Sequence, residues 1–353
     1  MSAIKHLQVH QVTADIDSYL IIDVRSEGEF YKAHLPGAIN IPILKDEERK
    51  IVGTTYKQKG RIEAVRVGLS LVGPHFVEVY DTLRAAIEST DKKIVFYCWR
   101  GGLRSHIAST IMAWGGSPIH VLQGGYKSYR NWVHETIAKE RKWIVLGGKT
   151  GSGKTQILHE LKKVGLQIID LEGLANHKGS TLGGIGFPPQ PSTEGFENML
   201  AWELKDFDVN EPVVVENESK RIGACVLPQD LWNQIQGANV IDILTEKESR
   251  ITRLYQEYAH LPLDELKEQT GKIRKRLGGQ NEQAAQVALD SGDFIEWIKI
   301  LLVYYDKTYT HSQQSEDQKM IPFEWQWKGD LQNIADEELL IELRNFIKNG
   351  LKK

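Results

Sequence analysis

The segment from Trp143 to Thr155 reads WIVLGGKTGSGKT, and it decides the fold of the part of the chain that follows it. Its apolar start predicts a buried strand, and Gly148–Thr155 matches the phosphate-binding pattern GxxxxGKT. A helix predicted over residues 156–164 turns its positive end toward a bound phosphate, and the threonine hydroxyl of such a loop reaches Mg²⁺. The order of strand, glycine-rich loop and helix predicts a diphosphate site made of Gly148, Gly151, Ser152, Gly153, Lys154 and Thr155.

A second loop that could take part in a reaction lies earlier in the chain, where Cys98–Arg104 reads CWRGGLR. It follows a buried strand predicted over 93–97, and parallel sheets bind ligands beyond the carboxyl ends of their strands. Backbone N–H groups and the positive end of the next helix favour a thiolate and a bound anion there, and Arg100 and Arg104 add positive charge. The pattern favours a reactive cysteine over a core cysteine. Cys225 has small and apolar neighbours and is predicted to be structural.

The composition, 41% hydrophobic and 26% charged residues in a chain of 353, is typical of a globular protein with two domains. Apolar runs stay well short of the roughly 20 residues of a membrane helix, so we expect a cytoplasmic protein with no membrane partner. The net charge of −3 excludes a strongly basic nucleic-acid-binding surface. RNA contacts are expected only from local patches, of which the densest comprises Lys272, Arg274, Lys275 and Arg276.

Strands alternate with helices along the chain, which is typical of parallel α/β sheets. Apolar runs predict further strands at 19–24, 119–122, 166–170, 212–216 and 239–244, and helical spacing appears at 63–72, 76–89 and 104–114. The charged stretch Lys139–Lys142 separates two predicted domains. Residues 1–138 form the first, and residues 139–353 form a P-loop domain with a helical C-terminal part.

The first domain resembles the rhodanese family, whose members carry sulfur or selenium on a cysteine as a persulfide or perselenide. The resemblance rests on separate motifs in the family's order: Ile22–Arg25, Glu29–Phe30, His34–Pro42, Tyr97–Cys98 and Gly124–Tyr126. The loop Cys98–Arg104 is one residue longer than most rhodanese loops and also matches the Cx5R loop of rhodanese-like phosphatases. The first domain by itself therefore leaves a chalcogen carrier and a phosphatase open.

The ligand of the phosphate loop is also open. A nucleoside triphosphatase usually has an apolar strand that ends in Asp, which organises Mg²⁺ and water. Here the corresponding run, Val213–Ser219, ends in Glu216 and Glu218. These two residues either serve a metal or a water molecule, or are simply polar residues at a strand end. The replacement of this Asp by Glu weakens a general ATPase assignment. A site that binds a diphosphate ester, from which the diphosphate then leaves, is still compatible with the sequence.

Over essentially the whole chain, the combination resembles the tRNA 2-selenouridine synthase family, in which a rhodanese domain precedes a P-loop domain. The supporting segments are Val52–Lys57, Tyr97–Ser105, Asp170–Ser180, Phe196–Asn198, Glu216–Gly223 and Tyr304–Asp306. The resemblance implies a transferase that acts on wobble 2-thiouridine in the anticodon stem-loop of tRNA. A geranyl group from geranyl diphosphate alkylates the sulfur, and selenium from selenophosphate then replaces the geranylated sulfur. A selenophosphate-supplying enzyme becomes a candidate partner.

The same resemblance implies the roles of the two loops. Cys98 would carry the selenium, Arg100 and Arg104 would stabilise its charge or bind selenophosphate, and the phosphate loop would hold the diphosphate. Further residues have two interpretations each. His177 either contacts substrate or RNA or is an ordinary surface histidine. Three arginines either bind phosphates or are solvated: Arg221, Arg250 and Arg253. Three aromatic residues either stack on anticodon bases or pack in the core: Trp297, Tyr304 and Tyr305.

Three competing functions remain at this level. One is a phosphatase that uses Cys98 and Arg104, coupled to a nucleotide-binding domain. Another is a sulfurtransferase that installs sulfur rather than selenium. The third is a non-enzymatic, nucleotide-regulated binding module, although a purely binding loop has no need for the Cys98 thiol.

Overall fold

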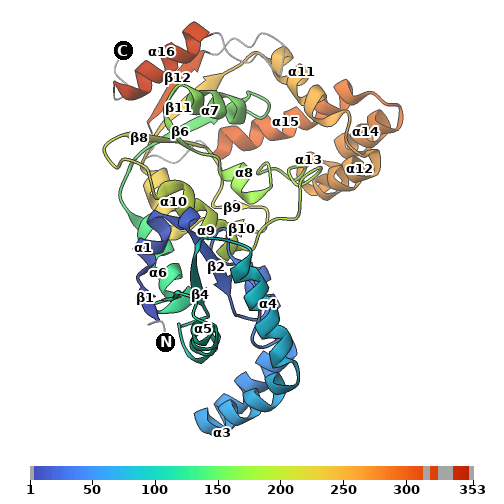
Figure 1. The fold of residues 1–353 in the computed structure, drawn as a ribbon. Helices are drawn as coiled ribbons and strands as arrows, with labels where there is room; N and C mark the ends of the chain where they lie inside the picture. The colour runs from blue at the N-terminus through green and yellow to red at the C-terminus, as the bar shows by residue number, and fades with distance from the viewer. Residues whose placement is uncertain (1–3, 313–318, 325–336, 350–353) are drawn as a thin grey trace. The chain divides into compact units, whose positions relative to one another are not determined.

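The structure is a computed structural model that describes residues 4–312, 319–324 and 337–349. It divides into two compact units. The first comprises Met1–Thr136 together with Glu197–Trp202, and the second comprises Ile137–Phe196 together with Glu203–Lys353. Each unit is built on its own five-stranded parallel sheet with helices against it (Figure 1), so the predicted fold class is confirmed.

The sheet of the first unit has the strand order β1-β5-β4-β2-β3, and every neighbouring pair is parallel. Its strands are β1 (Lys5–Leu7), β2 (Tyr19–Asp23), β3 (Ile39–Asn40), β4 (Lys93–Tyr97) and β5 (Ile119–Leu122). Its helices are α1 (Val9–Ala14), α2 (Glu27–Lys32), α3 (Asp46–Val72), α4 (Phe76–Glu88), α5 (Leu103–Trp114) and α6 (Gly125–Ala138). Side chains of α4 and α5 pack with those of β2 and β4 in one apolar cluster, which covers one face of this sheet.

A short segment from later in the chain completes the first unit. Asn198 donates through its side-chain nitrogen to the backbone oxygen of His34 (3.1 Å) and to the Tyr126 hydroxyl (3.0 Å), and its side-chain oxygen accepts from Arg130. Arg130 also pairs with Glu197. These contacts explain the Phe196–Asn198 motif, to which the sequence had assigned no structural role.

The sheet of the second unit has the order β12-β11-β6-β8-β7, again parallel throughout. Its strands are β6 (Lys142–Gly148), β7 (Gln167–Ile169), β8 (Pro212–Glu216), β11 (Asn239–Leu244) and β12 (Met320–Glu324), and a separate hairpin joins β9 (Arg221–Ile222) to β10 (Cys225–Val226). The strands β6, β7, β8 and β11 agree with the apolar runs predicted at these places. The edge strand β12 was not predicted.

Helices of the second unit fall into two groups. Those near the sheet are α7 (Lys154–Lys163), α8 (Leu171–Ala175), α10 (Gln229–Gln236) and α16 (Glu337–Lys348), of which α7 and α16 pack on the same apolar cluster as the strands. Helix α9 (Thr193–Leu204) is shared, because its residues Glu197–Trp202 belong to the first unit. The others are α11 (Lys247–Tyr258), α12 (Leu263–Lys272), α13 (Arg274–Leu277), α14 (Gly279–Asp290) and α15 (Phe294–Ser312). This second group forms a cluster of its own around the fully buried Trp297, whose indole N–H donates to Thr270. Trp297 is therefore a core residue and not a stacking platform.

None of the helices within the described ranges is both long and apolar enough to span a bilayer.

Candidate functional site

Cys98 is the first residue after β4 and lies at the carboxyl end of the first sheet, with 3% of its surface exposed. Its sulfur accepts a hydrogen bond from the backbone N–H of Gly102 at 3.2 Å, and the hydroxyl of Ser105 lies 3.2 Å from the same atom. Gly102 is the residue before α5, so the N-terminal end of this helix faces the sulfur. The Gly102 N–H and the helix N-terminus would stabilise a negative charge on sulfur or on an atom beside it.

The loop is held in place from the start of α6. The backbone N–H of Tyr126 donates to the oxygen of Cys98 (2.8 Å), and that of Lys127 donates to the oxygen of Trp99 (2.9 Å). Tyr126 is fully buried, and its ring lies 3.8 Å from the guanidinium carbon of Arg25. The predicted turn at Gly124–Tyr126 therefore has a specific task, which is to fix the backbone of the cysteine loop.

The two arginines of the loop differ in their surroundings. Arg104 donates to the carboxylate of Glu29 at 2.7 Å, although the sequence separates them by 75 positions. Burial of Glu29 would raise its pKa, but the hydrogen bond from Arg104 and the charges of Arg104 and Arg49 together outweigh this and lower the pKa of that carboxyl. Arg100 is exposed. Arg100 is thus the residue of the pair whose charge is available to an incoming anion.

The phosphate loop in the second unit connects β6 to α7 as predicted. The Lys154 ammonium lies 2.7 Å from the backbone oxygen of Gly148 and so spans the loop. The backbone N–H of Gly148 donates to the Tyr309 hydroxyl (2.6 Å), and that hydroxyl donates to Asp242 (2.6 Å). Tyr309 belongs to α15, so a residue 161 positions away holds the start of the loop.

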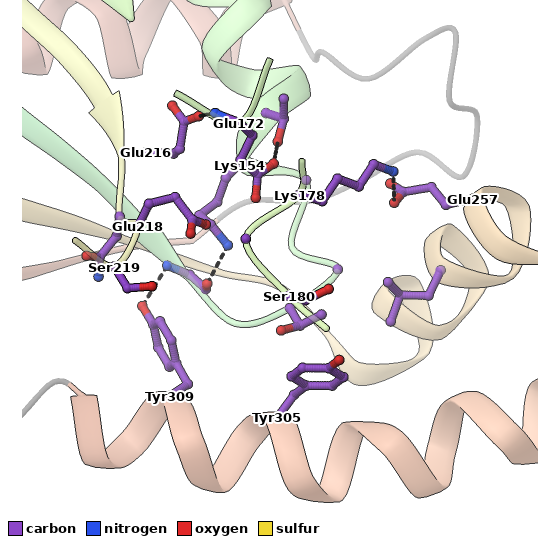
Figure 2. A pocket seen from close by; sticks show the side chains of 18 of the residues that line it. Lys154, Glu172, Lys178, Ser180, Glu216, Glu218, Ser219, Glu257, Tyr305 and Tyr309 are labelled. Carbon is purple, nitrogen blue, oxygen red and sulfur yellow. Dashed lines mark hydrogen bonds and ion pairs between the residues drawn. The ribbon is translucent and has the colours of Figure 1, made fainter. Parts of the chain in front are cut away.

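A cavity of about 870 Å³ opens over this loop. Five of the predicted diphosphate-binding residues line it: Gly148, Gly151, Gly153, Lys154 and Thr155. Ser152 lies beneath the loop with 1% of its surface exposed, and its backbone N–H donates to Lys149. Figure 2 shows Lys154, Glu172, Glu216 and Glu218 gathered on one side of this cavity, with Tyr305 and Tyr309 rising from α15 on another.

Three carboxyl groups surround the lysine and the threonine of the loop. Glu216, at the end of β8, accepts from the backbone N–H of Glu172 at 2.9 Å, and the carboxyl groups of Glu172 and Glu218 hydrogen-bond to each other. Glu216 is buried and the other two are half-buried, and this desolvation raises the pKa of Glu172 and of Glu216, and that of Glu218 to about 8. The charge of Glu172 contributes to the raised pKa of Glu218, so this cluster holds at least one proton near neutral pH.

We expect Glu218→Gln to flatten the pH dependence of stability. The pKa of Glu218 in the folded protein, about 8, lies above its ordinary value of 4.5, so the folded state binds more protons than the unfolded chain between these values. The wild type therefore loses up to about 1.4 kcal/mol of stability per pH unit as the pH rises through this range. Glutamine resembles the protonated carboxyl, and the melting temperature of the variant should fall less than that of the wild type between about pH 6 and about pH 8. Thermal melts beside the exposed-site control Glu211→Gln measure this, and parallel curves for Glu218→Gln and wild type would contradict it.

The same residues fit Mg²⁺ when a diphosphate is present. The Thr155 hydroxyl donates to the Glu172 carboxylate at 3.2 Å, so two oxygen donors already converge beside the loop. Mg²⁺ in phosphate-binding sites usually takes one or two carboxylates and completes its shell with water and phosphate oxygens. In the described part of the chain, no group of three or more His, Cys, Asp or Glu side chains could hold a metal ion. Thr155 and Glu172 would therefore hold the ion together with the ligand, and the ion would neutralise charge on the phosphates.

Arg253 adds a second cation to the lysine side of the loop. Its guanidinium group lies so close to Gly153 that a Cβ atom at this position would be 2.7 Å from the guanidinium carbon. Gly153 also has a φ of +87°, so only glycine fits here. Arg253 is 1% exposed and lines the cavity, whereas its neighbour Arg250 is bound to Asp306 and to the backbone oxygen of Thr150. Burial lowers the pKa of Arg253, and a bound anion would offset that cost.

Polar side chains contribute to the remaining lining of the cavity, and one part of it is aromatic and apolar. The side chains that form this part are Phe187, Trp232, Leu254, Tyr258, Tyr304 and Tyr305. Lys178 lies near two of these rings, 5.5 Å from Tyr258 and 5.9 Å from Phe187, and pairs with Glu257 at 2.9 Å. One cavity thus combines an anion-binding end with a wall suited to a hydrocarbon chain.

The other predicted residues lie at different places. Of the basic patch, Arg276 lines the cavity and contacts the Tyr304 hydroxyl at 3.4 Å. Lys272 and Arg274 pair with Glu268 and Glu282 instead. Among the described residues, the cavity lining does not include Lys275, Arg221 or His177. Lys275 and Arg221 are exposed. The ring of His177 lies beside Gly184, 3.5 Å from the point where a Cβ atom would be if that residue had one.

Sequence reasoning gave no role to several residues that complete the two sites. Glu172 follows β7, a neighbour of the strand that ends in Glu216, so the convergence of parallel strand ends was a signal that pointed to it. Ser105 comes directly after the arginine of the cysteine loop. Glu29 belongs to a motif of the rhodanese resemblance that did not indicate its partner, and Tyr309 carries no signal, because only the folded chain brings them to Arg104 and Gly148.

Comparison with known proteins agrees with both halves of the chain. A model of the rhodanese-like domain matches residues 8–132, and a model described as the tRNA 2-selenouridine synthase AAA domain matches residues 141–337. A tRNA 2-selenouridine synthase of Sulfurovum sp. (strain NBC37-1) is 36% identical over 92% of this chain and 95% of its own length. One of Shewanella frigidimarina (strain NCIMB 400) is 33% identical over 89% and 92%. The chain therefore belongs to the tRNA 2-selenouridine synthase family and is an enzyme of this type.

Proposed function

We propose that this protein converts 2-thiouridine at the wobble position of tRNA to 2-selenouridine in two steps, with geranyl diphosphate and selenophosphate as co-substrates. Membership of the family supports the formation of selenouridine in tRNA. The observation that carries the finer proposal is the cavity of the second unit, in which a phosphate loop faces an aromatic and apolar wall. An isoprenoid diphosphate needs both an anion-binding end and apolar contacts for its chain, and the strand that ends in Glu216 rather than Asp disfavours a nucleoside triphosphatase.

In the first step, the sulfur of 2-thiouridine forms a bond to C1 of the geranyl group. The C1–O bond breaks, diphosphate leaves with the electron pair, and the base loses its N3 proton. Lys154, the N–H groups of the loop and Arg253 face the place where negative charge develops on the departing diphosphate. Mg²⁺ held by Thr155 and Glu172 would supply further charge neutralisation there.

The geranyl chain would lie against the aromatic wall. Tyr258, Tyr304 and Tyr305 present ring faces to the cavity, and Leu254 extends the apolar surface toward Gly151. The cavity volume of about 870 Å³ lies within the range of about 300–1,000 Å³ that is common for small-molecule sites. Burial of the chain would favour the isoprenoid over inorganic diphosphate by the hydrophobic effect.

In the second step, selenium from selenophosphate replaces the geranylated sulfur. A C–Se bond forms at C2, the C–S bond breaks, geranyl thiol leaves with a proton, and water converts the phosphoryl group to phosphate. Over the whole step selenium keeps its oxidation state, so no external oxidant or reductant is consumed. Cys98 would hold the selenium beside the base at the selenide level, without an S–Se bond, while the Gly102 N–H donates to the anion and Arg100 attracts selenophosphate.

The environment of Arg104 supports this assignment over the phosphatase alternative. A Cx5R phosphatase needs its arginine to bind the phosphoryl oxygens in a bidentate manner. In this protein that residue donates to Glu29. A loop whose arginine is occupied by a carboxylate is poorly suited to phosphate monoesters but still offers backbone donors to a selenium anion.

The proposal is tested by omitting each co-substrate in turn. Purified full-length protein is incubated with a tRNA that carries wobble 2-thiouridine, and the nucleosides are analysed by mass spectrometry. Geranyl diphosphate alone should give S-geranyl-2-thiouridine, and both co-substrates together should give 2-selenouridine. Selenouridine formed without geranyl diphosphate would overturn the two-step scheme. Phosphate release from an aryl phosphate without any selenium dependence would favour the phosphatase.

A further inference from the structure

Helix α3 forms a two-armed projection of the first unit. Gly60 interrupts it with a φ of +82° and a ψ of −177°, and residues on either side of this kink come together: a Cβ atom at Gly68 would lie 3.6 Å from a Val52 methyl carbon. The arms therefore fold back on each other, with Gly60 between them. We call residues Tyr56–Ile62 the α3 tip. Figure 1 shows α3, in blue, extending away from the strands of its own unit.

The base of α3 is packed and the tip is not. Ala64 and Val72 are buried, and Val52 packs against the apolar core of the unit. All seven residues of the α3 tip are exposed, including Tyr56 at 59% and Ile62 at 88%. A helical segment that buries no face gains nothing from packing within its own unit, so its conformation and its exposed apolar side chains require another explanation.

The charge of the α3 tip indicates what it contacts. Residues 49–62 contain five Lys or Arg and no Asp or Glu, in a protein with a net charge of −3. The three basic residues of the tip itself, Lys57, Lys59 and Arg61, make no ion pair within the described residues, and the nearest acid, Glu63, is bound by Arg66 at 2.6 Å. Unneutralised cations on an exposed tip repel one another and favour a polyanion.

The uncharged residues of the tip narrow the choice of polyanion. Tyr56 presents an exposed ring beside the cations, and Ile62 adds an apolar contact on the other side of Gly60. RNA-binding surfaces combine cations for the phosphates with aromatic or apolar side chains for riboses and bases. Because tRNA is the proposed substrate, RNA is favoured over an acidic protein surface.

From this combination we infer that the α3 tip is a docking surface for the phosphate backbone of the substrate tRNA, with Lys57, Lys59 and Arg61 on phosphates and Tyr56 against a ribose or an unpaired base. The inference rests on the proposed function, which makes tRNA the substrate. The tip contains none of the residues assigned to either reaction step. It should therefore govern tRNA affinity and leave the reactivity of Cys98 unchanged.

The test removes the three charges and compares the result with a matched variant. K57Q/K59Q/R61Q loses three cations that form no ion pair among the described residues, and K50Q/R66Q/R84Q loses three exposed cations of α3 and α4 that pair with Glu47, Glu63 and Glu88. Full-length proteins are titrated with fluorescent 2-thiouridine tRNA at several salt concentrations. In K57Q/K59Q/R61Q the Kd should rise at least about tenfold, and the slope of log Kd against log salt should fall by roughly 2–3. The matched variant should change the slope by less than about 1.

Two further readouts separate the explanations. The rate of Cys98 alkylation by iodoacetamide, measured on the free proteins, should equal that of the wild type in both variants, which shows that the loop is intact. If wild-type protein binds tRNA and forms 2-selenouridine but K57Q/K59Q/R61Q keeps the wild-type Kd and salt slope, the inference about the tip is wrong and the proposed function stands. If wild-type protein neither binds nor modifies the tRNA, both are wrong.

Discussion

In the Cys98→Ala variant we expect 2-selenouridine to fall at least about a hundredfold while S-geranyl-2-thiouridine accumulates on the tRNA. The sulfur accepts from the Gly102 N–H and lies 3.2 Å from the Ser105 hydroxyl. Alanine removes the thiol that would hold the selenium beside the base. The phosphate loop belongs to the second unit and loses nothing, so alkylation should proceed at the wild-type rate.

The second cysteine supplies the control for this experiment. Cys225 lies in β10 with 1% exposure, and its thiol donates to the backbone oxygen of Pro191 at 3.5 Å. Burial raises the pKa of Cys225, which keeps it a thiol. Cys225→Ala should make both products, and its labelling with radioactive selenium should match the wild type. Wild-type amounts of 2-selenouridine from Cys98→Ala would refute the carrier role.

The Lys154→Ala variant should show the reverse pattern, with geranylation reduced by roughly 10²–10³-fold. The ammonium group faces the cavity beside Glu172 and Glu218 and donates to the oxygen of Gly148. Without this ammonium group, the carboxyl groups of Glu172 and Glu218 face the departing diphosphate with no positive charge from Lys154 between them. The loss should appear chiefly in kcat, because charge on the bridging oxygen develops only as the C–O bond breaks.

A substrate that already carries the geranyl group separates chemistry from folding. When Lys154→Ala receives tRNA with S-geranyl-2-thiouridine and selenophosphate, it should form 2-selenouridine at nearly the wild-type rate. Lys149→Ala, a substitution of the exposed neighbouring lysine in the same loop, should retain geranylation. A mixture of Cys98→Ala and Lys154→Ala should form the final product if the geranylated tRNA passes between molecules. Unimpaired geranylation by Lys154→Ala would mean that the diphosphate binds elsewhere.

Much of the fold followed from short-range patterns. The apolar runs at 93–97 and 143–147 became β4 and β6, and the loops after them connect to α5 and α7. Both strands are central in parallel sheets and buried on both faces. A strand buried on both faces needs apolar residues at successive positions, so it is recognisable in the sequence as an uninterrupted apolar run. Helix α3 was predicted only over 63–72, because its exposed tip has no apolar periodicity. The edge strand β12 contains a proline and lies far from the other strands in the sequence, so no local pattern indicated it.

The sequence by itself determined the two chemical devices of this protein, the thiol loop at Cys98 and the phosphate loop at Gly148–Thr155, because each is made by consecutive residues whose spacing sets the backbone geometry. Only the tertiary structure decided which partners act on them. Glu29 engages Arg104, Arg253 lies over Gly153, and Tyr309 holds Gly148, across separations that no periodicity encodes. Such pairs form because sheet packing brings distant strand ends and helices to one edge, where buried charges and backbone groups must find partners.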